Sequence, residues 1–226
     1  MTKRVVWMLV IAVVLGFAVL QWLGPQWLAL AGYEGEEGRD VVVFDFIAAP
    51  TAEFGARYAQ LLAEEEGAEV GSFAKAHLWR GPQASEYKQL LISRVPHGRN
   101  LLRVVTAPEY RGMTDSGVQR SILVGTAPLP ERIDDAALVV WSFALRASGR
   151  DPLLDLLPAL AASPGRVLWH HEILAVESDM GADLLVLAGF ADQETALTWL
   201  RMDDQRNLHD LINARVEEMA VLVVAR

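Results

Sequence analysis

The stretch Leu184-Leu185-Val186-Leu187-Ala188-Gly189-Phe190 decides the fold of this chain. None of its side chains is polar, which is typical of a strand that other elements cover on both faces. A helical segment follows at 192–200, and after a polar stretch a second apolar run lies at 219–225. The end of the chain therefore predicts a strand, a helix and a strand.

The segment Phe190-Ala191-Asp192-Gln193-Glu194-Thr195-Ala196-Leu197-Thr198-Trp199 also carries a resemblance. It resembles the strand-end and helix signature of small bacterial domains of unknown function in the dimeric α+β barrel superfamily. That superfamily is built on a ferredoxin-like βαββαβ unit and includes the antibiotic-biosynthesis monooxygenases. Ala107-Pro108-Glu109-Tyr110 resembles a Pro-Glu-Tyr step that such domains often carry. The resemblance implies the fold and leaves the function open.

The first part of the chain predicts the same kinds of element. Strands are expected at 41–47, 70–79, 89–95 and 121–126, and helices are expected to begin at Pro50-Thr51 and at Asn100. Phe54, Tyr58, Leu61 and Leu62 share one face of the first helix, and Gly67 is expected at the left-handed position just after its end. The order is that of one βαββαβ unit.

The pattern then restarts. Residues 138–143 match residues 41–46 at an offset of about 97 positions, and residues 193–200 match residues 98–105. Asp151-Pro152 is expected to begin a helix, and a second strand is expected at 165–177. Each unit alone would leave one apolar sheet face bare. We therefore expect an α+β fold of two tandem ferredoxin-like units, packed sheet to sheet as a pseudo-dimeric barrel.

The expected domains follow from these patterns and from two polar linkers. They are an N-terminal anchor or signal peptide at 1–33, a linker at 34–40, a first unit at 41–127, a linker at 128–136 and a second unit at 137–226.

The N-terminal segment predicts a membrane location. Lys3 and Arg4 precede the charge-free run 5–20, and Trp7 and Trp22 lie where an interfacial aromatic belt would fall. This pattern favours one transmembrane helix in the inner (cytoplasmic) membrane, with the N-terminus cytoplasmic and the body in the periplasm or outside. The alternative is a signal peptide cleaved after Ala29-Leu30-Ala31, which would make the protein secreted.

Composition excludes several classes of function. The chain has 226 residues and no cysteine, so it has no disulfide, thiolate metal site or cysteine nucleophile. Its formal net charge is −9, which disfavours nucleic acid as a partner. It also lacks the nucleophile-elbow, phosphate-loop and zinc-binding motifs.

The histidines give only weak candidates for a site. His170 and His171 would point to opposite faces of a strand, so no metal site is expected there. His77 and Trp79 share a face of the predicted strand 70–79. His97 and His209 are expected to be solvated or capping groups. Ligand-pocket candidates are Trp79, Tyr110 and Trp199, and no cofactor is expected.

Three hypotheses about function remain. The first is a non-enzymatic, membrane-anchored envelope protein whose body binds a small apolar molecule or a protein partner. The alternative is an enzyme resembling the cofactor-independent monooxygenases or isomerases of the superfamily, with His77 or His171 as proton carrier. A haem binder is a third hypothesis. A filled core with an exposed apolar groove would favour partner binding, whereas an enclosed pocket with a histidine beside another ionisable group would favour the enzyme.

Overall fold

The computed structural model describes residues 40–114, 120–125, 129–145, 165–173, 175–177 and 182–226. The expected N-terminal anchor and the helix expected after Asp151-Pro152 lie outside these residues. No helix in the described ranges is long and apolar enough to cross a membrane.

The described residues form nine strands in one sheet, and every strand pair is antiparallel. The order across the sheet is β6-β8-β5-β9-β2-β3-β1-β4-β7. The strands are β1 (Val41–Ile47), β2 (Ala68–Arg80), β3 (Gln89–Val95), β4 (Arg120–Gly125), β5 (Ala137–Leu145), β6 (Arg166–Glu172), β7 (Ala175–Glu177), β8 (Leu184–Phe190) and β9 (Val216–Ala225).

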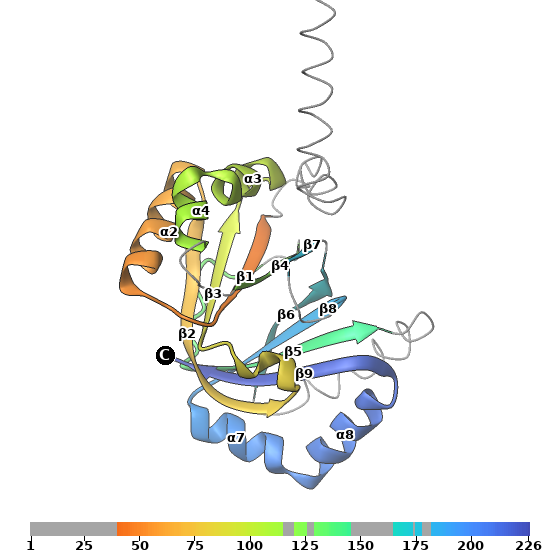
Figure 1. Ribbon diagram of the computed structural model, residues 1–226. Helices are drawn as coiled ribbons and strands as arrows, with labels where there is room; N and C mark the ends of the chain where they lie inside the picture. The colour runs from red at the N-terminus through yellow and green to blue at the C-terminus, as the bar shows by residue number, and fades with distance from the viewer. Residues whose placement is uncertain (1–39, 115–119, 126–128, 146–164, 174, 178–181) are drawn as a thin grey trace, which may run out of the picture.

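Two stretches of chain connect the halves of this sheet into a barrel (Figure 1). The first part of β2 pairs with β3, and its last part, from Ala74 to Arg80, pairs with β9. Similarly, β6 pairs with β8, whereas β7 pairs with β4. Only residues 173–174 separate β6 from β7, so the sequence-predicted strand 165–177 is two strands that join opposite ends of the sheet order.

Helices cover the outside of the barrel in two groups (Figure 1). The helices α2 (Ala52–Glu64), α3 (Gly98–Thr106) and α4 (Pro108–Thr114) lie over the first half. The helices α7 (Gln193–Arg201) and α8 (Asp203–Asn213) lie over the second half. The sequence analysis missed α4 and α8. Pro108 begins α4, because proline is tolerated in the first turn of a helix.

The barrel interior is packed with apolar side chains from both halves. Phe44, Phe46 and Phe73 of the first half share a cluster with Leu187 and Leu222 of the second half, and all five are at most 1% exposed. The connecting segments add side chains to the same cluster. Tyr87, which follows the short 3-10 helix η1 (Pro82–Ser85), packs 5.7 Å from Phe46, and Ile133 is fully buried. The interior is therefore a filled core shared by the two halves.

The end of α2 corrects one local prediction. Glu66 has a φ of 59°, so the left-handed residue after the helix is Glu66 and not Gly67. The amides of Glu66 and Gly67 donate to the carbonyls of Ala63 and Leu62, the hydrogen-bond pattern of a Schellman motif. Glycine is still required next to it, because a Cβ at Gly67 would lie 2.7 Å from Val95 Cγ1.

The offset of 97 between the first strands of the two halves is wrong by one residue. Val41 and Val43 face the helices, whereas Leu138 and Val140, their partners at that offset, face the barrel interior. An offset of 96 pairs Val41 with Ala137 and places residues of the same face opposite each other. A shift by one residue moves every side chain of a strand to the other face.

Candidate functional site

The two histidines predicted as proton carriers lie on different strands. His77 is exposed on β2, where it pairs with Val223, and its ring lies 6.0 Å from that of Trp79. His171 pairs with Leu185 through its backbone on β6, and its side chain is outside what the structure describes.

Two of the predicted pocket residues are buried in the cores between the sheet and the helices that cover it. Trp199 on α7 is 1% exposed and packs edge-on against Trp141, with ring centroids 5.7 Å apart. Tyr110 on α4 is 5% exposed, and its ring lies 6.2 Å from that of Tyr58. Neither residue lines the two clefts described below.

The described residues contain no group of three or more histidine, aspartate or glutamate side chains that could hold a metal ion. His97 occupies the N-cap position of α3, but its side chain makes no capping hydrogen bond.

His209 was expected to be a solvated or capping group, and this prediction is wrong. It lies on α8 and is only 1% exposed. The indole N–H of Trp141 donates to its Nε2 at 2.9 Å, and the carbonyl oxygen of Gln205 lies 2.7 Å from its Nδ1. Because the indole nitrogen can only donate, Nε2 must accept, and the ring proton therefore lies on Nδ1 and is donated to Gln205.

Burial favours the neutral form of His209. It lowers the pKa of the imidazole from the ordinary value, against an opposing effect of the Gln205 hydrogen bond; the charge of Arg80 lowers the pKa further and that of Asp210 raises it. Both ring nitrogens already have partners, so a substrate would have to displace one of them to reach the ring. His209 is therefore a structural histidine and a poor candidate for a proton carrier.

A cleft lies on the outer side of His209, and we call it the α8 cleft. Its lining residues are Trp79, Arg80, Arg206, His209 and Asp210, and its volume is about 320 Å³. Arg80, at the end of β2, forms an ion pair of 2.9 Å with Asp210 on α8. This ion pair joins a strand of the first half to a helix of the second half, since the two residues are 130 positions apart.

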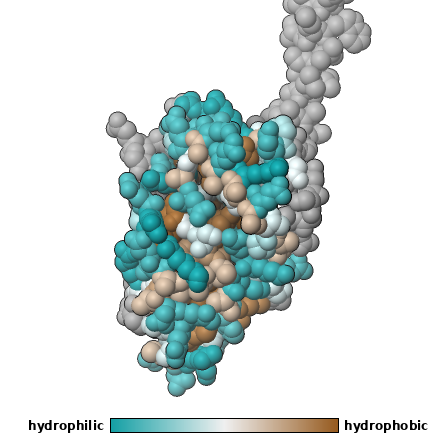
Figure 2. Space-filling view, turned by 90° about the vertical axis from the view of Figure 1, so that its left-hand side faces the viewer, coloured by the Kyte–Doolittle hydropathy of each residue, from teal (hydrophilic) through white to brown (hydrophobic). Residues whose placement is uncertain are grey.

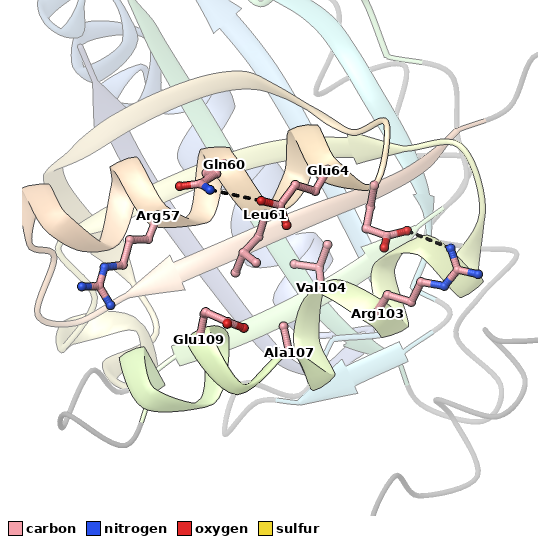
Figure 3. A pocket seen from close by; sticks show the side chains of 9 residues that line it. Arg57, Gln60, Leu61, Glu64, Arg103, Val104, Ala107 and Glu109 are labelled. Carbon is pink, nitrogen blue, oxygen red and sulfur yellow. Dashed lines mark hydrogen bonds and ion pairs between the residues drawn. The ribbon is translucent and has the colours of Figure 1, made fainter.

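A second cleft, which we call the helix groove, runs between α2 and α3–α4 (Figure 3). The half-buried Leu61 and Ala107 contribute its apolar surface, and Val104, which is 1% exposed, lies beneath them in the core. Its volume is about 290 Å³. The charged and polar residues along its rims are Arg57, Gln60, Glu64, Glu65, Arg103 and Glu109.

Ion pairs neutralise both arginines of the helix groove. Arg57 pairs with Glu53 at 2.7 Å, and Arg103 pairs with Glu65 at 3.2 Å. Glu64 accepts a hydrogen bond from Gln60, and neither Glu64 nor Glu109 has an ion pair with a described residue. The groove therefore combines an apolar surface with two carboxylates that lack a cationic partner in the described part of the chain.

The sequence carries a signal for the site around His209. Gln205, Leu208, His209 and Ile212 recur at the spacing of one helix face, and all four are buried against the sheet. The many polar residues of the segment concealed this stripe.

The comparisons with known proteins support the fold. No protein-family model matches the chain, and the search of curated proteins gave no match. Among solved structures, the chain is similar to an anthrone oxidase-like protein, with a TM-score of 0.54, 13% sequence identity and coverage of 86% of this chain and 94% of that chain. At this identity the similarity shows the fold alone.

Two further solved structures have TM-scores below 0.5, so they carry no argument. One is a protein from Lactobacillus acidophilus with a provisional monooxygenase assignment (TM-score 0.46, 6% identity, 83% of this chain and 94% of that chain). The other is a chlorite dismutase from Candidatus Nitrospira defluvii (TM-score 0.47, 8% identity, 83% of this chain and 91% of that chain). The sheet topology and the similarity to the anthrone oxidase-like structure confirm the predicted fold, a ferredoxin-like α+β fold of the dimeric α+β barrel type.

Proposed function

We propose that the protein is a binding module whose helix groove takes an amphipathic helix of a partner protein that carries lysine or arginine beside an apolar ridge. The observation that carries this proposal is the groove itself, with an apolar surface between α2 and α3–α4 and carboxylates on both rims. Helices that bind in grooves place apolar side chains on such a surface.

The charge of the groove rims determines which kind of partner helix the groove would bind. Arg57 and Arg103 are already paired, so Glu64 and Glu109 determine what the rims attract. The face of the molecule seen in Figure 2 is largely hydrophilic, with smaller apolar areas between. The chain as a whole is acidic. A basic helix would thus be attracted by the overall charge and oriented by the two rim carboxylates.

The position of the groove in the cell is part of the proposal. Residues 1–33 would anchor the protein in the inner membrane, with the barrel on the outer side. Residues 41–127 and 137–226 would be the two copies of a tandem repeat, joined by a linker at 128–136. The strand order supports the repeat. Across the sheet, the first half runs β2-β3-β1-β4 and the second half runs β6-β8-β5-β9. If the strands of each half are numbered along the chain, both halves have the order second, third, first, fourth.

A designed probe tests the groove. A fluorescent amphipathic peptide built only of leucine and lysine is titrated against the full-length chain, and its leucine–glutamate counterpart is the control. We expect micromolar binding of the lysine peptide alone. Glu64→Lys with Glu109→Lys should weaken it by about tenfold or more, as expected when charge complementarity is reversed.

A matched variant separates the groove from general acidity. Glu69→Lys with Glu86→Lys makes the same change of charge at two exposed sites outside the groove. This variant should bind the lysine peptide nearly as well as the wild type does. Equal weakening by both double variants would contradict the groove as the binding surface.

An enzyme is a second candidate function. It is favoured by the fold shared with a protein whose name describes an oxidase, and His77, His171 and Trp79 are the residues we would assign to it. If a substrate is found, His77→Ala with His171→Ala should abolish turnover. Full turnover in that double variant would exclude these histidines as proton carriers.

A further inference from the structure

The α8 cleft has a charge opposite to that of the whole chain. Arg80 and Arg206 carry two positive charges to it, Asp210 carries one negative charge, and His209 is neutral. The chain as a whole has a formal net charge of −9. Because Asp210 is paired with Arg80, Arg206 is left without an ion pair among the described residues. A locally positive cleft on an acidic protein favours an anion.

Among the residues that line the cleft, Trp79 supplies the aromatic surface. Trp79 is partly buried and packs against the core beneath α7 and α8. The imidazole of His209 stacks on Trp141, with a ring distance of 6.2 Å and an angle of 20°. His209 is only 1% exposed and both its ring nitrogens have hydrogen-bond partners, so it lies beneath the cleft and offers a ligand almost no surface and no free polar atom. The cleft therefore suits a ligand that has an aromatic body as well as a negative charge.

We propose that the α8 cleft is a binding site for a small aromatic carboxylate. Its ring would lie against Trp79, and its carboxylate would pair with Arg206 and share Arg80 with Asp210. The volume of about 320 Å³ lies at the lower end of the range for ligand pockets, which fits a molecule of one or two rings. This site is separate from the helix groove, since the two share no lining residue.

Replacing the two charged residues of α8 that line the cleft, Arg206 and Asp210, should change the affinity for benzoate in opposite directions. Arg206→Gln removes the guanidinium that has no ion pair among the described residues, and it should weaken binding of benzoate about tenfold, as is typical for a lost charge-assisted contact. Asp210→Asn removes the carboxylate that competes for Arg80 and should strengthen binding of benzoate about threefold or more. Asp210 is 70% exposed, so its replacement should leave the fold intact.

The test measures ligand binding to the full-length chain in detergent by ligand-observed NMR. A sample of detergent without protein is the blank. Benzoate is compared with benzyl alcohol, which lacks the charge, and with cyclohexanecarboxylate, which lacks the aromatic ring. Arg201→Gln is the matched control, because Arg201 is an exposed arginine of the neighbouring helix that does not line the cleft. The thermal unfolding midpoint of each variant shows that it is folded.

The proposal is supported if benzoate binds best, if Arg206→Gln weakens its binding and Asp210→Asn strengthens it, and if Arg201→Gln has no effect. It is overturned if Arg206→Gln and Arg201→Gln act equally, or if Asp210→Asn weakens binding. It is also overturned if benzyl alcohol binds as well as benzoate does. Failure of the peptide test at the helix groove would leave this result unchanged.

Discussion

The indole nitrogen of Trp141 lies 2.9 Å from Nε2 of His209, and this hydrogen bond joins the middle of β5 to α8 across 68 positions of sequence. Both residues are at most 1% exposed. The hydrogen bond thus holds the helix that carries Arg206 and Asp210 of the α8 cleft against the barrel.

Replacing Trp141 by Phe should destabilise the protein measurably. The change removes the only donor to Nε2 of His209 and leaves that nitrogen buried without a partner among the described residues. The expected cost in the free energy of unfolding is about 1–3 kcal/mol, before any loss of packing. Urea unfolding followed by circular dichroism measures it.

The control for this prediction is a double-mutant cycle with His209→Leu. Once the imidazole is absent, Trp141→Phe should cost less than it does in the wild type, because no acceptor is left unpaired. Strictly additive effects would mean that the hydrogen bond contributes nothing to stability.

Stability should depend on pH through His209. Its pKa is lowered in the folded state by burial, so the unfolded chain takes up a proton first as pH falls. The contribution of His209 is therefore fully present above pH 6.5, its ordinary pKa, and is lost as pH falls from 6.5 toward the lowered value. The slope in this window should be at most about 1.4 kcal/mol per pH unit.

A variant isolates this effect from the titration of carboxylates. His209→Gln keeps an acceptor for Trp141 and a donor for the Gln205 carbonyl, but it does not titrate. The difference in unfolding free energy between wild type and variant should shrink as pH falls below 6.5. A difference that stays constant from pH 8 to pH 5 would show that His209 keeps its ordinary pKa after folding.

Two glycines should respond in opposite directions to replacement by alanine. Gly81 has a φ of 90°, and a Cβ there would lie 2.8 Å from the Cα of Ala220. Gly81→Ala should therefore destabilise the protein by at least about 1–3 kcal/mol. Gly55 lies inside α2 with nothing within 4 Å of its virtual Cβ, so Gly55→Ala should stabilise by about 0.5–1 kcal/mol. Chemical denaturation measures the change in unfolding free energy of both variants. If both variants changed stability in the same direction, the left-handed backbone at Gly81 would be contradicted.

The sequence predicted most strands because they are buried on both faces. The expected bounds 41–47, 89–95 and 184–190 agree with β1, β3 and β8. The same property explains the error of one residue in the offset between β1 and β5. A strand that is apolar on both faces does not alternate, so its sequence does not show which residues point inward.

The candidate site was harder to predict. Trp79 was a pocket candidate and lines the α8 cleft, but its neighbours Arg206, His209 and Asp210 come from a helix that was expected only as a polar stretch. Asp203, Asp204 and Asn207 dominate the composition of that segment, and its buried stripe contains two polar residues, Gln205 and His209. The pairing of Arg80 with Asp210 depends on how the two halves meet, which no local pattern contains.

The central structural claim is that the two halves form one barrel and share its interior. In the first half alone, β2 would lose its pairing with β9, β4 would lose β7, and the inward faces of Phe44, Phe46 and Leu90 would be uncovered. Burying such a face contributes about 25 cal/mol per Å² of apolar surface, which is large against a total stability of about 5–15 kcal/mol.

Sedimentation velocity on three polypeptides tests this claim most directly. Residues 39–130 and residues 131–226, each expressed alone, should dimerise or aggregate, whereas residues 39–226 should sediment as a compact monomer. A folded, monodisperse monomer from either half alone would contradict the shared interior, because its inward sheet face would then be stable in water without the other half.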